Sequence, residues 1–221
     1  MSDSSQDSGK RPRSSAADLL AARVDELRAA VRKVEPKVLA AHTGAAFDAE
    51  KNEFRLSLWN GEVILDFPAL HGREGNSGQE LPPPVQALLL YYFSTSDGLP
   101  VAGKWISFAG LPDGRIYNQA YQGYSGDELA RQIGDDLSAF ERAAEKLGGQ
   151  RWQSGDSAYV FWALPRLPLL VVCWRGDEEF PSSCKILFDA SASHHLPTDV
   201  CAILGSMLTR RLLKATGENR V

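Results

Sequence analysis

The clearest pattern along the chain is an alternation of apolar and polar residues on both sides of an Asn-Gly pair. Residues 53–59 and 62–67 flank Asn60-Gly61, which accepts positive φ at both positions and is typical of a type I′ turn. A two-residue loop at this pair sets position 58 opposite 63, 56 opposite 65 and 54 opposite 67. All six positions are apolar, so the pattern predicts a β-hairpin with one buried face.

Apolar residues at spacings of three and four predict an amphipathic helix over residues 15–36, after a polar segment 1–14 that we expect to be a disordered tail. The apolar stripe of this helix consists of Leu20, Val24, Leu27 and Val31. This stripe either packs on the rest of the chain or forms the seam of a homodimer. It covers fewer than three heptads and is interrupted by Pro36, which favours packing within the chain.

The remaining patterns predict a buried helix over 85–93, a helix over 126–147 with a break at Gly134, and a final helix from Thr198. The last helix is expected to turn Val200, Ile203, Leu204, Met207 and Leu208 inward. Residues 157–164, 169–174 and 185–188 are expected to be strands. Because strands cluster and do not alternate with helices, the order predicts an α+β fold. We expect a single domain, 37–216, with a mostly antiparallel sheet of about five strands and packed helices.

Composition places the chain among globular proteins, with 43% hydrophobic and 24% charged residues. The formal net charge is −4, and the acidic excess is concentrated between residues 35 and 196, which argues against nucleic-acid binding. The absence of a long apolar run argues against a membrane protein. Three scattered cysteines and a polar N-terminus lead us to expect a soluble cytoplasmic protein with free thiols.

Carboxylates, imidazoles and a thiol are concentrated between residues 177 and 201. Asp177, Glu179 and Asp189 are candidate catalytic carboxylates, because paired acids serve general acid–base chemistry. The candidate metal ligands are His194, His195 and Cys201. Cys201 could also be a nucleophile, since a helix N-terminus lowers a thiol pKa. The alternative is structural: turn amides bind the carboxylates, adjacent histidines point apart, and Cys201 is a buried apolar residue.

Aromatic residues gather in a stretch, 97–118 and just beyond, that has few regular signals and is expected to be loop-like. Aromatic side chains on loops over a sheet can line a ligand pocket, or they can hold a long loop against the core. We take four of the chain's aromatic residues as candidate ligand-binding residues. They are Trp105, Tyr117 and Tyr121 from this region, where Phe108 and Tyr124 also lie, and Trp174.

Several of these segments also carry a family resemblance. The run 174–181, Trp-Arg-Gly-Asp-Glu-Glu-Phe-Pro, the run 186–189, Ile-Leu-Phe-Asp, and Leu196 occur in an order similar to that of an uncharacterised prokaryotic family, the domain of unknown function numbered 3786. The resemblance covers about residues 37–213 and implies no agreed activity. Some relatives resemble iron–sulfur proteins through an extra cysteine cluster, but this chain has no cysteine before Cys173.

These observations together predict a soluble binding or accessory module for a small ligand or a protein partner. The competing hypothesis is a metal- or carboxylate-assisted enzyme centred on residues 177–195. The sequence does not identify a cofactor for either function.

Overall fold

The computed structural model describes residues 16–217, so the expected tail 1–14 lies outside the described residues. The helices are α1 (Ala16–Val31), α2 (Pro36–Thr43), α3 (Pro83–Thr95), α4 (Gly114–Gly123), α5 (Gly126–Ile133), α6 (Leu137–Lys146) and α7 (Thr198–Gly217). The strands are β1 (Ala46–Asp48), β2 (Glu53–Leu58), β3 (Gly61–Asp66), β4 (Gly72–Glu74), β5 (Trp105–Ser107), β6 (Gln150–Trp152), β7 (Ser157–Leu164), β8 (Leu167–Trp174) and β9 (Ser183–Asp189).

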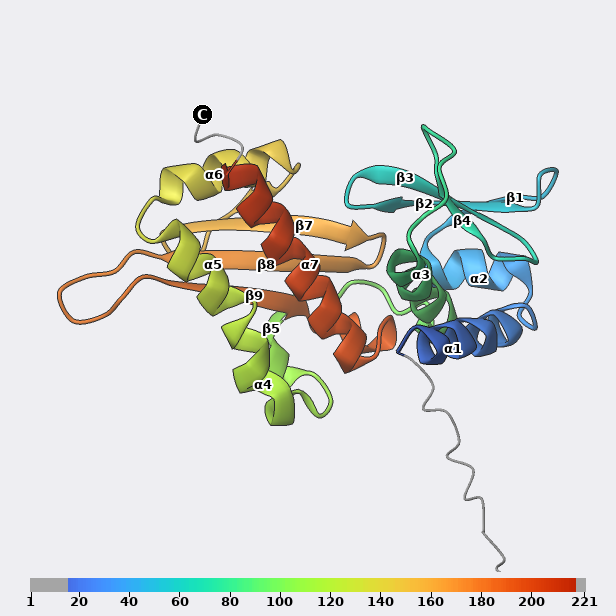
Figure 1. Cartoon of the computed structure of the whole chain (residues 1–221), viewed down its shortest axis with the longest axis horizontal. Coiled ribbons are helices and arrows are strands. Elements are labelled where there is room, and N and C mark those ends of the chain that lie inside the picture. The colour runs from blue at the N-terminus through green and yellow to red at the C-terminus, as the bar shows by residue number, and fades with distance from the viewer. Residues whose placement is uncertain (1–15, 218–221) are drawn as a thin grey trace, which may run out of the picture.

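The predicted α+β class is confirmed, but the strands form two antiparallel sheets where we expected one of about five strands. One sheet has four strands in the order β1-β2-β3-β4, and the other has five in the order β5-β9-β8-β7-β6. Figure 1 shows the four-stranded sheet with α1, α2 and α3 on the right and the five-stranded sheet with α4 to α7 on the left. The expected single domain, 37–216, stays a prediction.

The predicted hairpin exists, but its register differs by two residues from the expected one. Phe54 pairs with Leu65 and Leu56 with Val63, and the positive φ values belong to Trp59 and Asn60. A shift of two keeps every side chain on its expected face, because the side-chain period of a strand is two. Tertiary contacts hold this turn, since the Trp59 amide donates to Ala163 O and the Arg211 guanidinium lies 5.5 Å from the Trp59 ring centroid.

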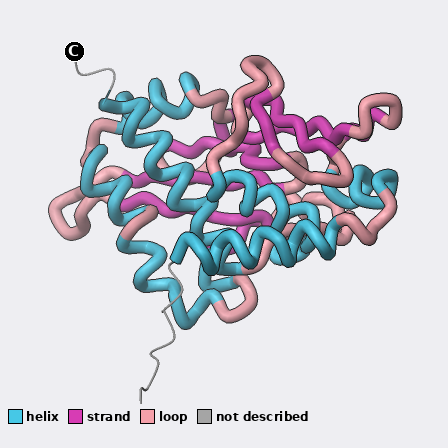
Figure 2. The backbone as a smooth tube through the Cα atoms, turned by 45° about the vertical axis from the view of Figure 1, so that its right-hand side comes forward, coloured by secondary structure: helices cyan, strands magenta, loops and turns pink. Residues whose placement is uncertain are grey.

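The apolar stripe of α1 is covered within the chain. Val24, Leu27 and Val31 are buried and Leu20 is partly buried against the core, where α1 packs on α3. Figure 2 shows helices at the left, along the bottom and at the right of the molecule, with strands in the middle and at the upper right. The residues that we considered for a homodimer seam therefore already have partners in the same chain, and dimerisation through them stays untested.

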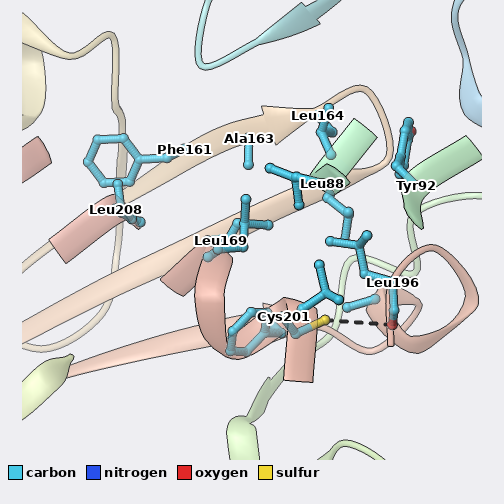
Figure 3. Close-up of a cluster of buried hydrophobic side chains, with 14 of the residues drawn as sticks. Leu88, Tyr92, Phe161, Ala163, Leu164, Leu169, Leu196, Cys201 and Leu208 are labelled. Carbon is cyan, nitrogen blue, oxygen red and sulfur yellow. Dashed lines mark hydrogen bonds between the residues drawn. The ribbon is translucent and has the colours of Figure 1, made fainter. Parts of the chain in front are cut away.

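The buried core is continuous between the two sheets. Figure 3 shows Leu88 and Tyr92 of α3 beside Leu164 of β7, and Leu208 of α7 beside Phe161.

Cys173 and Cys184 are cross-strand partners on β8 and β9 and form a disulfide, which corrects the expectation of free thiols for these two residues. Cys201 alone keeps a free thiol.

Two further features of the fold bear on the site. The expected break at Gly134 is present, since α5 ends at Ile133 and Asp136 caps α6 by accepting a hydrogen bond from the Ala139 amide at 3.0 Å. The stretch that we expected to be loop-like contains β5 and the start of α4 instead.

Across residues 16–217, every helix is too short or too polar to traverse a lipid bilayer.

Candidate functional site

A groove of about 740 Å³ opens between α4 and α7, with α5 beside it. Three large side chains stand exposed along it: Tyr117 at 63%, Ile203 at 53% and Tyr124 at 45% of full exposure. The groove is lined by Phe108, Tyr117, Ala120, Gly123, Tyr124, Glu128, Asp199, Ala202, Ile203, Ser206, Thr209, Arg210 and Leu213. Its walls are therefore mostly apolar, with a few charged and hydroxyl groups among them, which is the usual make-up of a small-molecule site.

The groove rests on a rigid aromatic layer. Phe108 stacks on Tyr121 with ring centroids 4.2 Å apart, and Tyr121 also contacts Tyr124 edge-on at 5.8 Å. Tyr121 is fully buried, and its hydroxyl has no hydrogen-bond partner among the described residues. Burial raises its pKa well above the usual range of a phenol. Burial likewise raises the pKa of Tyr124. Tyr121 thus supports the groove from below and does not line it.

The charged groups at the groove differ in how they are satisfied. Glu128 forms an ion pair with Arg131, and that hydrogen bond lowers the pKa of the Glu128 carboxyl. Arg210 has no carboxylate partner among the described residues, and its Nη2 donates to Ser206 Oγ at 2.8 Å. Asp199 lies at the opposite end of the groove, in the first turn of α7. Among the described residues, the groove therefore carries one cation without a carboxylate partner, Arg210, and two carboxylates: Glu128, which is paired with Arg131, and Asp199, some distance along α7.

Two of the expected ligand-binding residues, Trp105 and Trp174, lie elsewhere, on the other face of the five-stranded sheet. The strand registers place four tryptophans on that face: Trp105, Trp152, Trp162 and Trp174. Trp105 and Trp174, together with Leu187, pack against a small buried cluster that consists of Ala158, Val160, Leu170 and Val172. The indole rings of Trp105 and Trp152 meet edge-on at 5.9 Å, and Lys185 Nζ lies 5.6 Å from the Trp174 ring centroid. Of the four candidates, only Tyr117 lines the groove.

The three candidate catalytic carboxylates are not brought together. Asp177 and Glu179 lie in the loop before β9, whereas Asp189 ends that strand. Seven extended residues span roughly 20 Å, so the two ends of β9 cannot act on one substrate atom. Asp177 Oδ1 accepts hydrogen bonds from the amides of Phe180 and Glu179, and these bonds lower its pKa. Asp177 therefore stabilises its own turn.

Asp189 is a buried structural carboxylate. Its Oδ1 accepts hydrogen bonds from the Ala102 amide, the Ser191 amide and the Ser191 hydroxyl. Burial alone would raise the pKa of this carboxyl, but the bonds from Ser191 and from the backbone of residues 102 and 103 outweigh burial and lower it. The ionised side chain thus fastens the segment before β5 to the end of β9.

The two histidines point to different surroundings, as adjacent positions predict. His194 is exposed, and its Nδ1 lies 2.7 Å from Asp97 Oδ2, a contact that lowers the pKa of Asp97. His195 is buried, with Nε2 3.0 Å from Leu99 O and Nδ1 3.3 Å from Ser96 Oγ. Because a carbonyl only accepts, Nε2 carries the proton and donates to it. Burial lowers the pKa of His195 and keeps the ring neutral.

Cys201 lies inside the core and not at the surface of a site. Its Sγ donates to Leu196 O at 3.7 Å, as Figure 3 shows, and burial raises its pKa to about 12. This is the opposite of the lowered pKa that we expected from a helix N-terminus. Within residues 16–217, no group of three or more His, Cys, Asp or Glu side chains is placed to hold a metal ion. His194, His195 and Cys201 therefore do not form a shared ligand set in this structure.

Sequence reasoning missed the contribution of α7 to the groove. We expected Ile203 to face inward, but it is exposed, while Val200, Leu204 and Leu208 are buried. The groove-lining residues of α7 are Asp199, Ala202, Ile203, Ser206, Thr209, Arg210 and Leu213. These positions repeat at spacings of three and four, so a second stripe beside the core stripe was the available signal.

Comparison with known proteins places the chain in a family without assigning a function to it. No curated protein and no solved structure matches the chain. A family model described as a domain of unknown function (DUF3786) matches residues 35–211, which include both sheets, the 177–201 segment and all of the groove lining except Leu213. The match covers most of the sequence, and the chain belongs to this family.

Proposed function

We propose that this protein is a binding module whose α4–α7 groove holds a small, mainly apolar ligand. The observation that carries the proposal is that Tyr117, Tyr124 and Ile203 stand exposed around one hollow of about 740 Å³. Small-molecule sites commonly have volumes of roughly 300–1,000 Å³ and apolar walls with a few polar groups. A ligand in the groove would remove these three side chains from water, which is favourable.

The construction of the groove supports a preformed site. Its floor is Phe108, which is buried and stacked on the buried ring of Tyr121. Its α7 wall belongs to a helix whose opposite face packs into the main core through Leu204, Leu208 and Leu212. A site that exists before binding avoids the entropic cost of ordering its walls, which favours affinity.

The alternative of a carboxylate-assisted enzyme centred on 177–195 receives no support from the side-chain placement, because its carboxylates lie at opposite ends of β9 and are engaged in backbone turns. The proposal retains a cytoplasmic location on the evidence of few and scattered cysteines, although the Cys173–Cys184 disulfide does not favour a reducing compartment.

The neutral fluorophore N-phenyl-1-naphthylamine tests this proposal, because its emission rises in an apolar site. We expect the wild-type protein to bind it saturably and Ile203→Asp to weaken binding at least tenfold. The matched control is Ile116→Asp, since Ile116 is an exposed isoleucine on α4, at 75% exposure, that does not line the groove. Equal weakening in both variants, or no saturable binding by the wild type, would contradict the proposal.

A further inference from the structure

We propose that the ligand of the α4–α7 groove is an amphipathic monocarboxylate, whose carboxylate binds Arg210 and Ser206 and whose apolar chain runs along α7 toward Asp199. This inference rests on the proposed function and names the class of ligand. It follows from three features of the groove: an unsatisfied donor pair at one end, an apolar middle, and a carboxylate at the other end.

Arg210 provides the cationic end. It is exposed and lines the groove, and none of the carboxylates in residues 16–217 lies within ion-pair distance of it. By contrast, Glu128 across the groove is already paired with Arg131. A guanidinium has five N–H donors in a planar fork and binds carboxylates in a bidentate manner, whereas the bond to Ser206 uses only one Nη2 hydrogen.

Ser206 extends this donor set. Its Oγ accepts from Arg210 Nη2 at 2.8 Å, and its own hydroxyl hydrogen has no acceptor among the described residues. The neighbouring Thr209 hydroxyl, in contrast, donates to Gly205 O at 3.2 Å. The bond from Arg210 also holds the guanidinium alongside α7 and close to the groove wall. Arg210 and Ser206 therefore present several N–H and O–H donors to one acceptor group, the pattern that an anionic oxygen requires.

The middle of the groove suits an alkyl chain. Between Arg210 and Asp199 the α7 wall presents Ile203 and Ala202, and Phe108 and Tyr117 face the same hollow. Arg210 lies eleven residue steps along the helix from Asp199, a rise of roughly 16 Å. A chain of the length found in laurate fits within this distance. The Asp199 carboxylate at the far end repels a second anionic group, so a monocarboxylate is favoured over a dicarboxylate.

Displacement of bound N-phenyl-1-naphthylamine by three ligands with the same chain tests the inference. The ligands are laurate, 1-dodecanol and dodecyltrimethylammonium, each used below its aggregation concentration at pH 7.5. We expect laurate to displace the probe from the wild type at a concentration at least tenfold below that of dodecanol, because a charge-assisted hydrogen bond is stronger than a neutral one. Arg210→Gln should remove this advantage, so that laurate and dodecanol displace the probe at similar concentrations once each is referred to the affinity of the variant for the probe.

The matched control is Lys214→Gln, which removes the same charge one turn further along α7, from an exposed position outside the groove. It should retain the preference for laurate. Equal displacement by laurate and dodecanol, or an equal loss in both variants, would overturn the inference while probe binding still supports the proposed function. Preferred displacement by dodecyltrimethylammonium would overturn it in favour of a cation at Asp199. Failure of the probe to bind would overturn both.

Discussion

Gly205 lies in α7 directly against Tyr121, and a methyl group at this position tests the layer that supports the groove. An alanine Cβ at position 205 would lie 2.9 Å from Tyr121 Cε2 and 3.0 Å from Cζ, and closer still to the hydroxyl oxygen. Overpacking of a buried contact costs about 1–3 kcal/mol, whereas alanine is favoured over glycine inside a helix by about 1 kcal/mol. Gly205→Ala should therefore lower the free energy of unfolding by about 1 kcal/mol.

Tyr121→Phe should have the opposite effect on the same contact. The Tyr121 hydroxyl is buried without a hydrogen-bond partner among the described residues, so its removal relieves an uncompensated desolvation cost and should stabilise the protein by about 1 kcal/mol. In the Tyr121→Phe background the atom nearest to the new Cβ is gone. Gly205→Ala should then cost less than in the wild-type background, because the closest contact is gone while the ring carbons Cε2 and Cζ, at 2.9 and 3.0 Å, remain. The expected coupling between the two substitutions is about 0.5–1 kcal/mol.

Urea unfolding followed by far-ultraviolet circular dichroism gives the four free energies of this double-mutant cycle. Gly123→Ala in α4 is the control, because an added Cβ there meets no atom within 4 Å, and it should not destabilise the protein. The deduced contact between α7 and the aromatic layer is refuted if Gly205→Ala is as stable as the wild type. It is also refuted if Gly205→Ala loses the same free energy in the wild-type background and in the Tyr121→Phe background.

Three further outcomes test the buried polar groups. Because burial holds the pKa of His195 below its ordinary value of 6.5, the free energy of unfolding should fall as pH drops below 6.5, and His195→Gln should flatten that fall in urea titrations at about pH 5.5 and 8. Native protein should resist iodoacetamide at Cys201 until urea unfolds it, since the pKa of about 12 keeps the thiol protonated; rapid native labelling would revive the nucleophile hypothesis. Asp189→Asn should lower the free energy of unfolding at pH 7 by about 1–3 kcal/mol, and clearly more than Asp177→Asn, whose side chain is exposed; equal losses would refute the structural role.

The hairpin shows what local pattern can and cannot predict. The alternation of apolar residues correctly predicted which side chains face the core, because that depends only on the period of two. The register was wrong by two residues because the turn is centred on Trp59 and Asn60, both with positive φ. Contacts with distant residues stabilise this choice: Asn60 Nδ2 donates to Leu147 O at 3.0 Å, and Arg211 lies over the Trp59 ring. No pattern near residue 60 carries that information.

The division of the strands into two sheets could not be predicted from the sequence for a similar reason. Strands β1, β4, β5 and β6 have three residues each, too few to show a period of two. Alternation also says which face of a strand is buried but not which other strand is its neighbour, and β5 pairs with β9 across about eighty residues of sequence. The α+β class could be predicted because it depends on the clustering of strands along the chain, which does not change when a single helix such as α4 is missed.

The groove depends on α4. It could not be predicted from the sequence because the stretch 97–118, which contains the start of α4, was expected to be loop-like. Tyr117, Tyr121 and Tyr124 follow one another at spacings of four and three, a helical period that was present in the sequence. This period puts Tyr117 and Tyr121 on the same side of α4, but Tyr121 is buried and Tyr117 is exposed, so the two aromatic candidates differ in role. Without α4, nothing flanks the second stripe of α7, and Ile203 at its centre is most simply assigned to the core. A residue beside a core stripe becomes part of a binding site only when a neighbouring helix leaves a hollow there, which is a property of the packing between helices and not of either helix alone.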